Sequence, residues 1–318
     1  MSFIPGPLRL RRENQRFFLN TNEVRGIQSI QFAYTIPSSP LVYIGQTGVA
    51  EIANGAYGGQ ASISTLIVKD DPFIDLTGDT PFNGYLYETK HKKALDSNSI
   101  DIGFTSGFLS TYSLTCGIGE IPRVDASISV FGNIGKIAPG DPTSNPLTSP
   151  GTAGTAGTSL VSTHYNTIQS SENKNFTLKI ADPRSLSLSM DNFETNRLNN
   201  FSIDIDIART PIYGLGEKSP IHVERNFPIP VTCSFQIDLD AHNMRSKTGY
   251  DHNTLRDFPC TEYTENLSLT FYDHYSDSEI ISYNFTDLLL VSHSHAANIN
   301  GNVVANLSYR ALINKSKI

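Results

Sequence analysis

Residues 201–207 alternate strictly between apolar and polar side chains. One phenylalanine and three isoleucines occupy the odd positions, and Ser202, Asp204 and Asp206 occupy the even ones. A period of two residues is typical of a β-strand that buries one face and exposes the other. The stretch therefore predicts a half-buried strand.

The same pattern occurs 171 residues earlier, at residues 30–36. Each of the two strands is followed by a proline-led segment that ends in glycine, so that Gly216 falls on Gly45 (216 − 45 = 171). Residues 61–70 match residues 231–240 at an offset of 170.

A third match sets residues 109–129 over residues 288–308 at an offset of 179. Strands in one order at slowly drifting offsets predict a duplicated domain with loop insertions. Because the identity is low, chance similarity between β-rich segments is the alternative.

The chain of 318 residues is long enough for two domains. We expect one domain over residues 1–137, including an N-terminal arm, and a second over residues 176–318. Residues 138–175 are rich in Pro, Gly, Ser and Thr and have neither the strand nor the helix period, which is typical of a linker or a long surface loop. A polar insertion at residues 241–262 has no counterpart in the first half.

Local patterns predict further elements. Residues 108–116 and 123–131 alternate as a hairpin-like pair, and two prolines predict a turn at residues 37–40. Residues 70–76, where aspartates precede a proline, predict a short helical turn. The expected fold class is all-β, with two tandem β-sandwich or barrel domains and short flanking helices.

Charge and cysteine content narrow the functional classes. A net charge of −7 disfavours a protein built to bind phosphate backbones tightly. The three cysteines show no Cys-x-x-Cys spacing, so we expect neither a disulfide scaffold nor a zinc site. We also expect that the protein is synthesised in a reducing compartment. The sequence shows neither a secretory signal nor the ~20 apolar residues of a membrane span.

His293 and His295 place two imidazoles on one face of a predicted strand, as in some metal sites. The sequence fixes no third ligand, and a pair of surface or groove histidines is the other interpretation. No nucleophile elbow, phosphate loop or dinucleotide motif occurs. We therefore expect no enzymatic activity, no cofactor and no metal.

Two aspartate pairs, Asp204 with Asp206 and Asp238 with Asp240, can in principle act as acid and base or bind calcium. Their strict strand alternation favours a solvated, negatively charged sheet face instead.

Residues 24–34, which begin Val-Arg-Gly-Ile-Gln-Ser, and the Pro-led segment at residues 40–45 resemble the opening strands of bacteriophage major tail (tail tube) proteins, and residues 198–216 repeat that framework. The resemblance implies β-sandwich or partly closed barrel domains whose sheets join around a ring, with rings stacked into a hollow DNA-conducting tube. In the duplicated-domain type, three chains form a pseudo-hexameric ring.

The resemblance further implies a virion tail protein that is assembled in the host cytoplasm. Its partners would be other copies of itself, other tail proteins and double-stranded DNA that passes without tight binding. No membrane would be involved. A lumen that lets DNA slide should repel phosphate, because Lys and Arg contacts hold DNA strongly at low salt. Asp204, Asp206, Asp238 and Asp240 are therefore the candidate lumen-facing residues.

Three alternatives remain open. A distal tail or baseplate hub protein with two tube-like domains would form one ring and would not polymerise. A surface β-sandwich adhesin would bind sugar or calcium, although the chain has no Trp for sugar stacking. A hydrolase would need a clustered histidine and nucleophile that the sequence does not supply.

Overall fold

The computed structural model describes residues 15–20, 22–35, 37–41, 44, 51–54, 58–67, 71–88, 101–132, 134–137, 181–190, 193–195, 198–215, 220–239, 264–273, 279–297 and 303–313. The predicted all-β class is confirmed, because these residues lie almost entirely in antiparallel strands. Their single helical element is the 3-10 turn η2 (Ile74–Thr77), which overlaps the end of the helical turn predicted at residues 70–76. The proposed linker at residues 138–175 and the insertion at residues 241–262 lie outside the described residues.

The strands before the linker are β1 (Gln15–Leu19), β2 (Asn22–Val24), β3 (Ile27–Thr35), β4 (Ser38–Leu41), β5 (Glu51–Asn54), β6 (Gly58–Leu66), β7 (Phe82–Glu88), β8 (Asp101–Gly117), β9 (Arg123–Val130) and β10 (Ile134–Ile137). Those after it are β11 (Ala181–Met190), β12 (Phe193–Thr195), β13 (Leu198–Asp206), β14 (Arg209–Ile212), β15 (His222–Arg225), β16 (Ile229–Leu239), β17 (Thr264–Asp273), β18 (Glu279–Ala297) and β19 (Val303–Ile313). The predicted hairpin at residues 108–116 and 123–131 is confirmed as β8 and β9.

The turn predicted at residues 37–40 is wrong. Residues Ser38–Leu41 form β4 and pair with β5 in a separate two-stranded ribbon. Proline is tolerated in such a ribbon because each strand has an outer edge that needs no ladder hydrogen bond.

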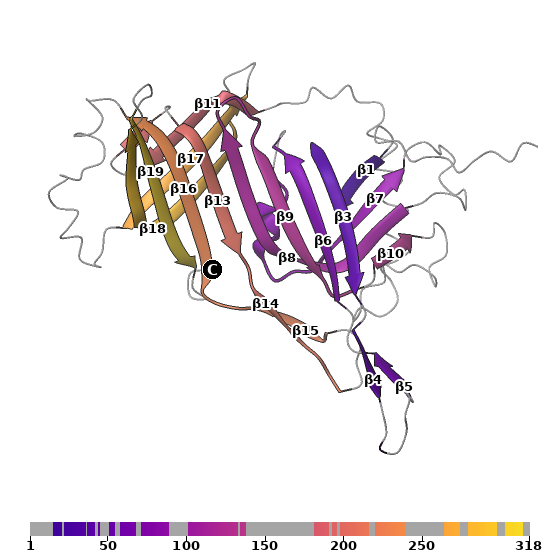
Figure 1. Ribbon diagram of the computed structural model, residues 1–318. Helices are drawn as coiled ribbons and strands as arrows, with labels where there is room; N and C mark the ends of the chain where they lie inside the picture. The colour runs from indigo at the N-terminus through magenta and orange to yellow at the C-terminus, as the bar shows by residue number, and fades with distance from the viewer. Residues whose placement is uncertain are drawn as a thin grey trace, which may run out of the picture.

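A row of eight strands runs through the middle of the molecule in the order β3-β6-β9-β8-β13-β16-β19-β18, and every neighbouring pair is antiparallel (Figure 1). We call this row the main sheet. The contact between β8 and β13 is the point at which the first half of the chain joins the second.

The long strands β8 and β18 each bend out of the main sheet into a second layer. The first part of β8 pairs with β7, which leads to β1 and β2, and the first part of β18 pairs with β17, which leads to β11 and β12. The two halves therefore have corresponding strand orders. The order in the first half is β2-β1-β7-β8-β9-β6-β3, and the order in the second half is β12-β11-β17-β18-β19-β16-β13. We call these two sets of strands module 1 and module 2.

Pairing registers identify equivalent residues in the two modules. In β1 and β2, Phe17 pairs with Val24, and in β11 and β12, Leu188 pairs with Thr195, so each member lies 171 residues later (188 − 17 = 171). This offset is the one that the alternating pattern predicts for the strand at residues 201–207.

The bends of β8 and β18 also correspond. Each contains a non-glycine residue with positive φ, Ser106 at 50° and Asp287 at 58°, which lie 181 residues apart (287 − 106 = 181). Such residues are uncommon in folded chains. The register against the next strand shifts after Leu109 in β8 and after Leu290 in β18, again 181 residues apart.

The pairing corrects two predicted offsets. Phe32 pairs with Ala61, and Ile203 pairs with Cys233, so Ala61 corresponds to Cys233 at an offset of 172 and not to Val231 at an offset of 170. The offset for β8 and β18 is likewise 181 and not 179. Each difference is two residues, which leaves every side chain on the same face of its strand.

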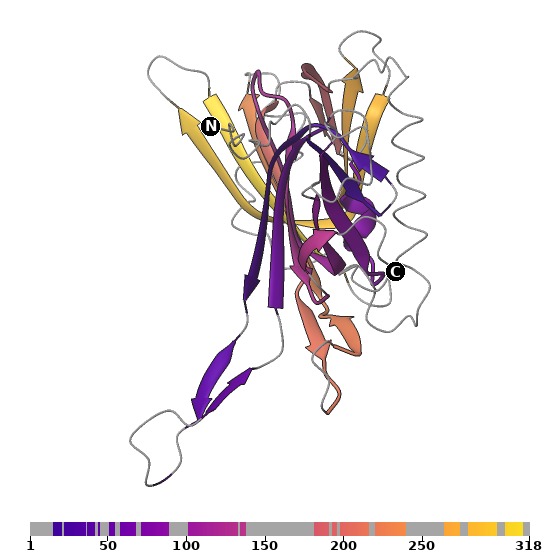
Figure 2. The ribbon, with the colours of Figure 1, turned by 90° about the vertical axis from the view of Figure 1, so that its right-hand side faces the viewer.

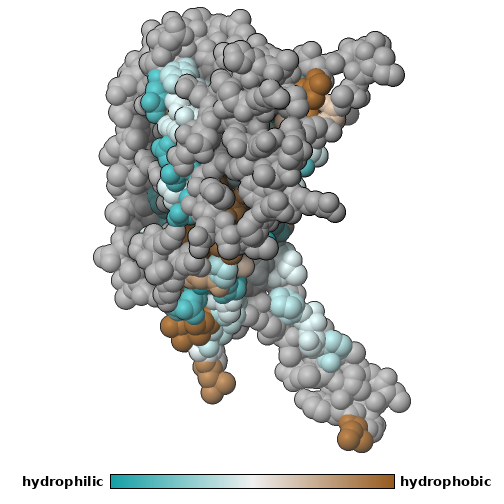
Figure 3. Space-filling model, turned by 90° about the vertical axis from the view of Figure 1, so that its left-hand side faces the viewer, coloured by the Kyte–Doolittle hydropathy of each residue, from teal (hydrophilic) through white to brown (hydrophobic). Residues whose placement is uncertain are grey.

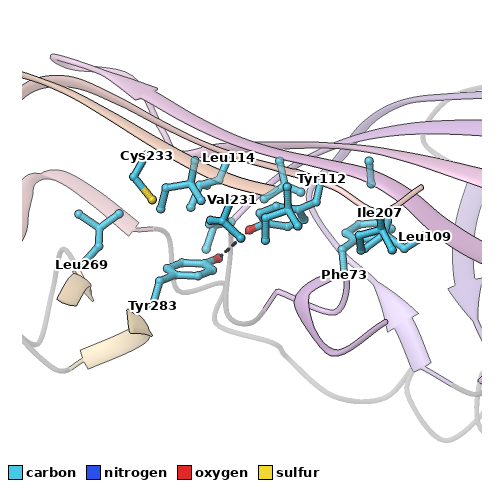
Figure 4. Packing of buried hydrophobic residues seen from close by; sticks show 14 of the residues in the cluster. Phe73, Leu109, Tyr112, Leu114, Ile207, Val231, Cys233, Leu269 and Tyr283 are labelled. Carbon is cyan, nitrogen blue, oxygen red and sulfur yellow. Dashed lines mark hydrogen bonds between the residues drawn. The ribbon is translucent and has the colours of Figure 1, made fainter. Parts of the chain in front are cut away.

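The two modules share one hydrophobic core. Buried Asp71, which follows β6, accepts hydrogen bonds from the Tyr112 hydroxyl of β8 (2.5 Å) and the Tyr283 hydroxyl of β18 (2.8 Å), both at Oδ2. Its Oδ1 accepts a hydrogen bond from the Phe73 amide (3.0 Å). Figure 4 shows the hydroxyls of Tyr112 and Tyr283 turned toward each other, 3.4 Å apart. Burial raises the pKa of Asp71, and these hydrogen bonds oppose the rise.

Candidate functional site

One face of the main sheet packs into the core, and the other is polar. In β13, Phe201, Ile203 and Ile205 are buried, whereas Asp204 and Asp206 on the opposite face are exposed. The predicted alternation of this strand is therefore confirmed. Residues directly opposite each other on paired strands point to the same side, so the registers extend this face over all eight strands. We call it the polar face.

Hydroxyl and amide side chains dominate the polar face. From β3 to β13, one row of paired residues reads Gln31, Ser62, Ser127, Thr111 and Asp206. These side chains are exposed or half-buried.

A second row consists of serines from β13 to β18, namely Ser202, Ser234, Ser308 and Ser292. The hydroxyl of Ser234 donates a hydrogen bond to that of Ser308 (3.3 Å).

A third row forms a chain of amide hydrogen bonds across four strands. Asn200 Nδ2 donates to Gln236 Oε1 (3.3 Å), and Gln236 Nε2 donates to Asn306 Oδ1 (3.1 Å). Asn306 Nδ2 in turn donates to Ser294 Oγ (3.4 Å). Such a ladder satisfies the side-chain polar groups by hydrogen bonds within the sheet and fixes their orientation.

Three of the four candidate carboxylates can be located. Asp204 accepts a hydrogen bond from Ser113 Oγ (2.6 Å), and half-buried Asp238 accepts one from Asn199 Nδ2 (2.6 Å). Asp206 is exposed at the end of β13. Asp240 lies outside the described residues.

The structure does not bring Asp204 and Asp238 together. Asp204 lies opposite Thr232, which precedes Asp238 by six residues on β16. At roughly 3.3 Å per residue the two carboxylates are about 20 Å apart along the strand. This separation is too great for a shared proton or a shared cation.

The polar face has a fourth described carboxylate, Asp125, which is not among the predicted site residues. Asp125 lies opposite Ser113, which puts it on the polar face beside Asp204. Its half-exposed side chain forms an ion pair with Arg123 (3.0 Å). The signal was available, because Asp125 alternates with the buried residues Val124 and Ala126 of β9.

The described part of the polar face carries four carboxylates and two guanidinium groups, and it carries no lysine. The carboxylates belong to Asp125, Asp204, Asp206 and Asp238, and the arginines are Arg123 and Arg310. The surface is therefore weakly negative, and at physiological salt its field extends only about 8 Å.

His293 lies on β18 opposite Leu307, a core residue, and it is half-buried. The side chain of His295 lies outside the described residues. Within the described chain, no group of three or more His, Cys, Asp and Glu side chains is arranged to hold a metal ion. No helix among these residues has the length and apolar character needed to cross a bilayer.

Two β-hairpins, β4–β5 and β14–β15, project from the same end of the main sheet (Figures 1 and 2). Hydrophobic residues lie toward the ends of both projections, coloured brown in Figure 3. The exposed large apolar residues that the structure describes in these segments are Ile44, Ile212, Tyr213, Leu215 and Ile221. Exposed apolar side chains gathered on one end of a molecule indicate an interaction surface.

Two arginines attach the β14–β15 hairpin to module 1. Arg209, whose side chain is buried, donates hydrogen bonds to the carbonyl oxygens of Leu109 (2.9 Å) and Gly78 (2.8 Å). Arg225 donates to the Asp79 carboxylate (2.8 Å), which also contacts Arg209. Desolvation lowers the pKa of Arg209 to about 10, so its guanidinium remains charged at neutral pH. We call Arg209, Arg225 and Asp79 the arginine clamp.

Comparison of the sequence with models of known protein families and with curated proteins gives no match.

Proposed function

We propose that this chain is a structural subunit of a bacteriophage tail tube. Copies assemble into rings that stack into a hollow tube, and the polar face lines the lumen through which double-stranded DNA passes. The observation that carries the proposal is the main sheet itself, in which two modules of identical strand order already join side by side into one continuous sheet with one polar face.

The junction of the modules supports ring formation. β8 of module 1 pairs with β13 of module 2. These two strands are not equivalent in the modules, so the contact is heterologous. Heterologous contacts generate rings when the rotation between units closes. A chain with two equivalent modules can repeat the same contact with its neighbours, and three chains would give six modules.

The chemistry of the polar face supports a conduit for DNA. Arginine and lysine contacts to phosphate account for most non-specific DNA affinity. The described polar face has more carboxylates than guanidinium groups, and its remaining side chains are mainly hydroxyls and amides. Such a surface stays hydrated and does not retain a phosphate backbone.

The dispersal of the carboxylates supports a structural role over an enzymatic one. Two carboxylates that act as acid and base must both lie within reach of one substrate bond. Asp204 and Asp238 are too far apart for that task, and each accepts a hydrogen bond from a neighbouring side chain of the sheet.

The hairpins supply a surface for stacking. They project from one end of the main sheet with exposed apolar residues, whereas Ile118, also exposed, lies at the other end beyond the last residue of β8. Rings stacked in one direction would bring unlike ends together and bury both sets.

Electron microscopy of the purified chain tests the assembly. Hollow tubes of threefold or sixfold symmetry are expected. Rings that never stack would instead favour a distal tail or baseplate hub protein. A particle that stays monomeric at every concentration would contradict the proposal.

A charge reversal tests the lumen. Asp204→Lys with Asp206→Lys replaces two negative charges by two positive ones in each chain, and both side chains are exposed on the polar face. Tubes should still assemble, but they should now retain double-stranded DNA, with an affinity that falls steeply as salt rises. Glu279→Lys, an exposed position at the start of β18, is the matched control and should leave DNA passage unchanged. Equal DNA retention in the two variants would remove Asp204 and Asp206 from the lumen.

A further inference from the structure

The two outer strands of the main sheet lack the features that normally protect an edge. In the described chain, β3 pairs only with β6, and the segment of β18 at residues 290–297 pairs only with β19. Monomeric proteins usually blunt such edges with short strands, charges or proline. The nine residues of β3 and the eight of that β18 segment contain no Lys, Arg, Asp, Glu or Pro.

The ends of the second layer differ in this respect. The edge strands β2 and β12 are only three residues long, and each contains a glutamate, Glu23 and Glu194. The long uncharged edges are therefore confined to the main sheet, where pairing with another strand would continue the polar face.

The internal junction specifies what such a pairing would look like. β3 is the module 1 equivalent of β13 at an offset of 171, and β18 is the module 2 equivalent of β8 at an offset of 181. The outer edges of β3 and β18 are thus the two surfaces that meet in the β8–β13 contact. They lie at opposite edges of the main sheet, so they can pair with each other only between two copies of the chain.

Exposure at equivalent positions agrees with this assignment. Ile205 is 5% exposed at the internal junction, whereas its equivalent Tyr34 is 42% exposed. Tyr34 would be covered if a second copy reproduced the junction.

We propose that β3 of one copy pairs antiparallel with β18 of the next copy, in the register of the internal β8–β13 junction. Asp204 pairs with Ser113 inside the chain, and the same offsets pair Ala33 of one copy with Ser294 of the next (204 − 171 = 33; 113 + 181 = 294). Neighbouring pairs are Gln31 with Ala296 and Thr35 with Ser292. This pairing rests on the proposed ring assembly and names the surfaces that build it.

The contact between copies lacks the arginine clamp of the internal one. Arg209 and Arg225 of the arginine clamp correspond to Ser38 and Asn54, because β14–β15 and β4–β5 pair in the same register at an offset of 171. Serine and asparagine cannot reproduce the guanidinium contacts. A ring would therefore contain clamped junctions within chains and unclamped junctions between them.

Cysteine pairs test the register. The Ile207 amide donates to the Ser110 carbonyl, so the adjacent polar-face pairs, Asp204 with Ser113 among them, are non-hydrogen-bonded pairs, whose Cα atoms lie about 4.5 Å apart. That distance permits a disulfide. Under mild oxidation, the assembled double variant Ala33→Cys/Ser294→Cys should form covalent oligomers. A reducing agent should separate these into single chains.

Ala33→Cys/Ser292→Cys is the matched control, because its cysteines would be diagonal neighbours, roughly 7–8 Å apart. It should cross-link at least tenfold more slowly, as should each variant that carries only one of the substitutions. All three positions are exposed, so the reduced variants should fold and assemble like the wild type.

Hydrogen exchange on the unmodified chain provides a second measurement. Amides on the outer edges of β3 and of residues 290–297 of β18 should exchange at least tenfold more slowly in assemblies than in the separate chain. Tubes that form without this protection, or that cross-link faster through the control pair, would overturn the pairing and leave the tube function intact. A wild-type chain that never assembles would overturn both.

Discussion

Tyr283→Phe removes one of the two hydroxyls that donate to the buried Asp71 carboxylate. The Tyr283 hydroxyl lies 2.8 Å from Asp71 Oδ2, and the Tyr112 hydroxyl shares the same oxygen. Asp71 and Tyr112 belong to module 1, and Tyr283 belongs to module 2. The variant therefore weakens a contact that joins the two modules while keeping the aromatic ring that packs against Phe271.

The expected loss depends on pH. A hydrogen bond to a charged group contributes about 1.5–3 kcal/mol, and a neutral one about 0.5–1.5 kcal/mol. Burial raises the pKa of Asp71 above 3.8, so the folded state binds this proton more tightly than the unfolded state does. The stability that this proton provides is complete below pH 3.8 and is lost as the pH rises through the folded pKa.

Removing a donor to the carboxylate raises the folded pKa further, so the variant should lose more stability at pH 7.5 than at pH 4. We expect a loss of about 1.5–3 kcal/mol at pH 7.5 and about half as much at pH 4. Urea unfolding of the unassembled chain at both pH values, followed by circular dichroism, measures the difference.

Tyr309→Phe is the matched control. Tyr309 is also buried, on β19 against Phe235, and it is not among the hydrogen-bond partners that shift the pKa of Asp71. The free energy of unfolding that Tyr309→Phe loses should be nearly the same at the two pH values. A Tyr283→Phe loss of equal size at pH 4 and pH 7.5, or one below about 0.5 kcal/mol at pH 7.5, would show that the hydroxyl does not stabilise an ionised Asp71.

Two further substitutions test the packing and the arginine clamp by urea unfolding. Gly84→Ala would place a Cβ 2.4 Å from the ring of Phe104 and should cost about 1–3 kcal/mol, whereas Gly135→Ala meets nothing within 4 Å and should change stability by less than about 0.5 kcal/mol. Arg209→Ala leaves main-chain carbonyls of module 1 without their donor and should cost about 1–3 kcal/mol for each one that stays buried, with faster hydrogen exchange in β14–β15. Arg123→Ala, which breaks a half-exposed ion pair, should cost less than about 1 kcal/mol. An equal loss of stability in Gly84→Ala and Gly135→Ala, or in Arg209→Ala and Arg123→Ala, would contradict the assigned contacts.

Alternation alone predicted much of the main sheet. The strand at residues 201–207 and the hairpin of β8 and β9 follow from a period of two, because each buries one face against the second layer and leaves the other polar. The same alternation placed Asp204 and Asp206 on an exposed face. These features depend on local order, which a sequence records directly.

The registers could not be predicted in the same way. A slip of two residues returns every side chain to its own face, so the hydrophobic pattern cannot distinguish an offset of 170 from 172, or 179 from 181. The bends at Ser106 and Asp287 fix the second offset. Neither residue is a glycine, which is the usual sequence signal for positive φ, and the equivalence became visible only in three dimensions.

The buried contacts between modules were also beyond the sequence. Asp71, Tyr112 and Tyr283 lie far apart in the chain, and nothing in the sequence around each residue indicates the others. The arginine clamp is similar, because Arg209 donates to carbonyls that lie 100 and 131 residues away. Such contacts follow from topology, and topology follows from pairings that alternation leaves open.

The proposed ring would be built from two kinds of junction that share one strand register but differ in strength. The β8–β13 junction forms within one chain, so it carries no translational or rotational cost of association. It is reinforced by the arginine clamp and by the shared core around Asp71. The β3–β18 junction between copies bears the full association cost and has Ser38 and Asn54 where the clamp has its arginines. Dilution or mild denaturant should therefore separate whole chains from a tube before either module of any chain unfolds, and the separated chain should keep its internal junction.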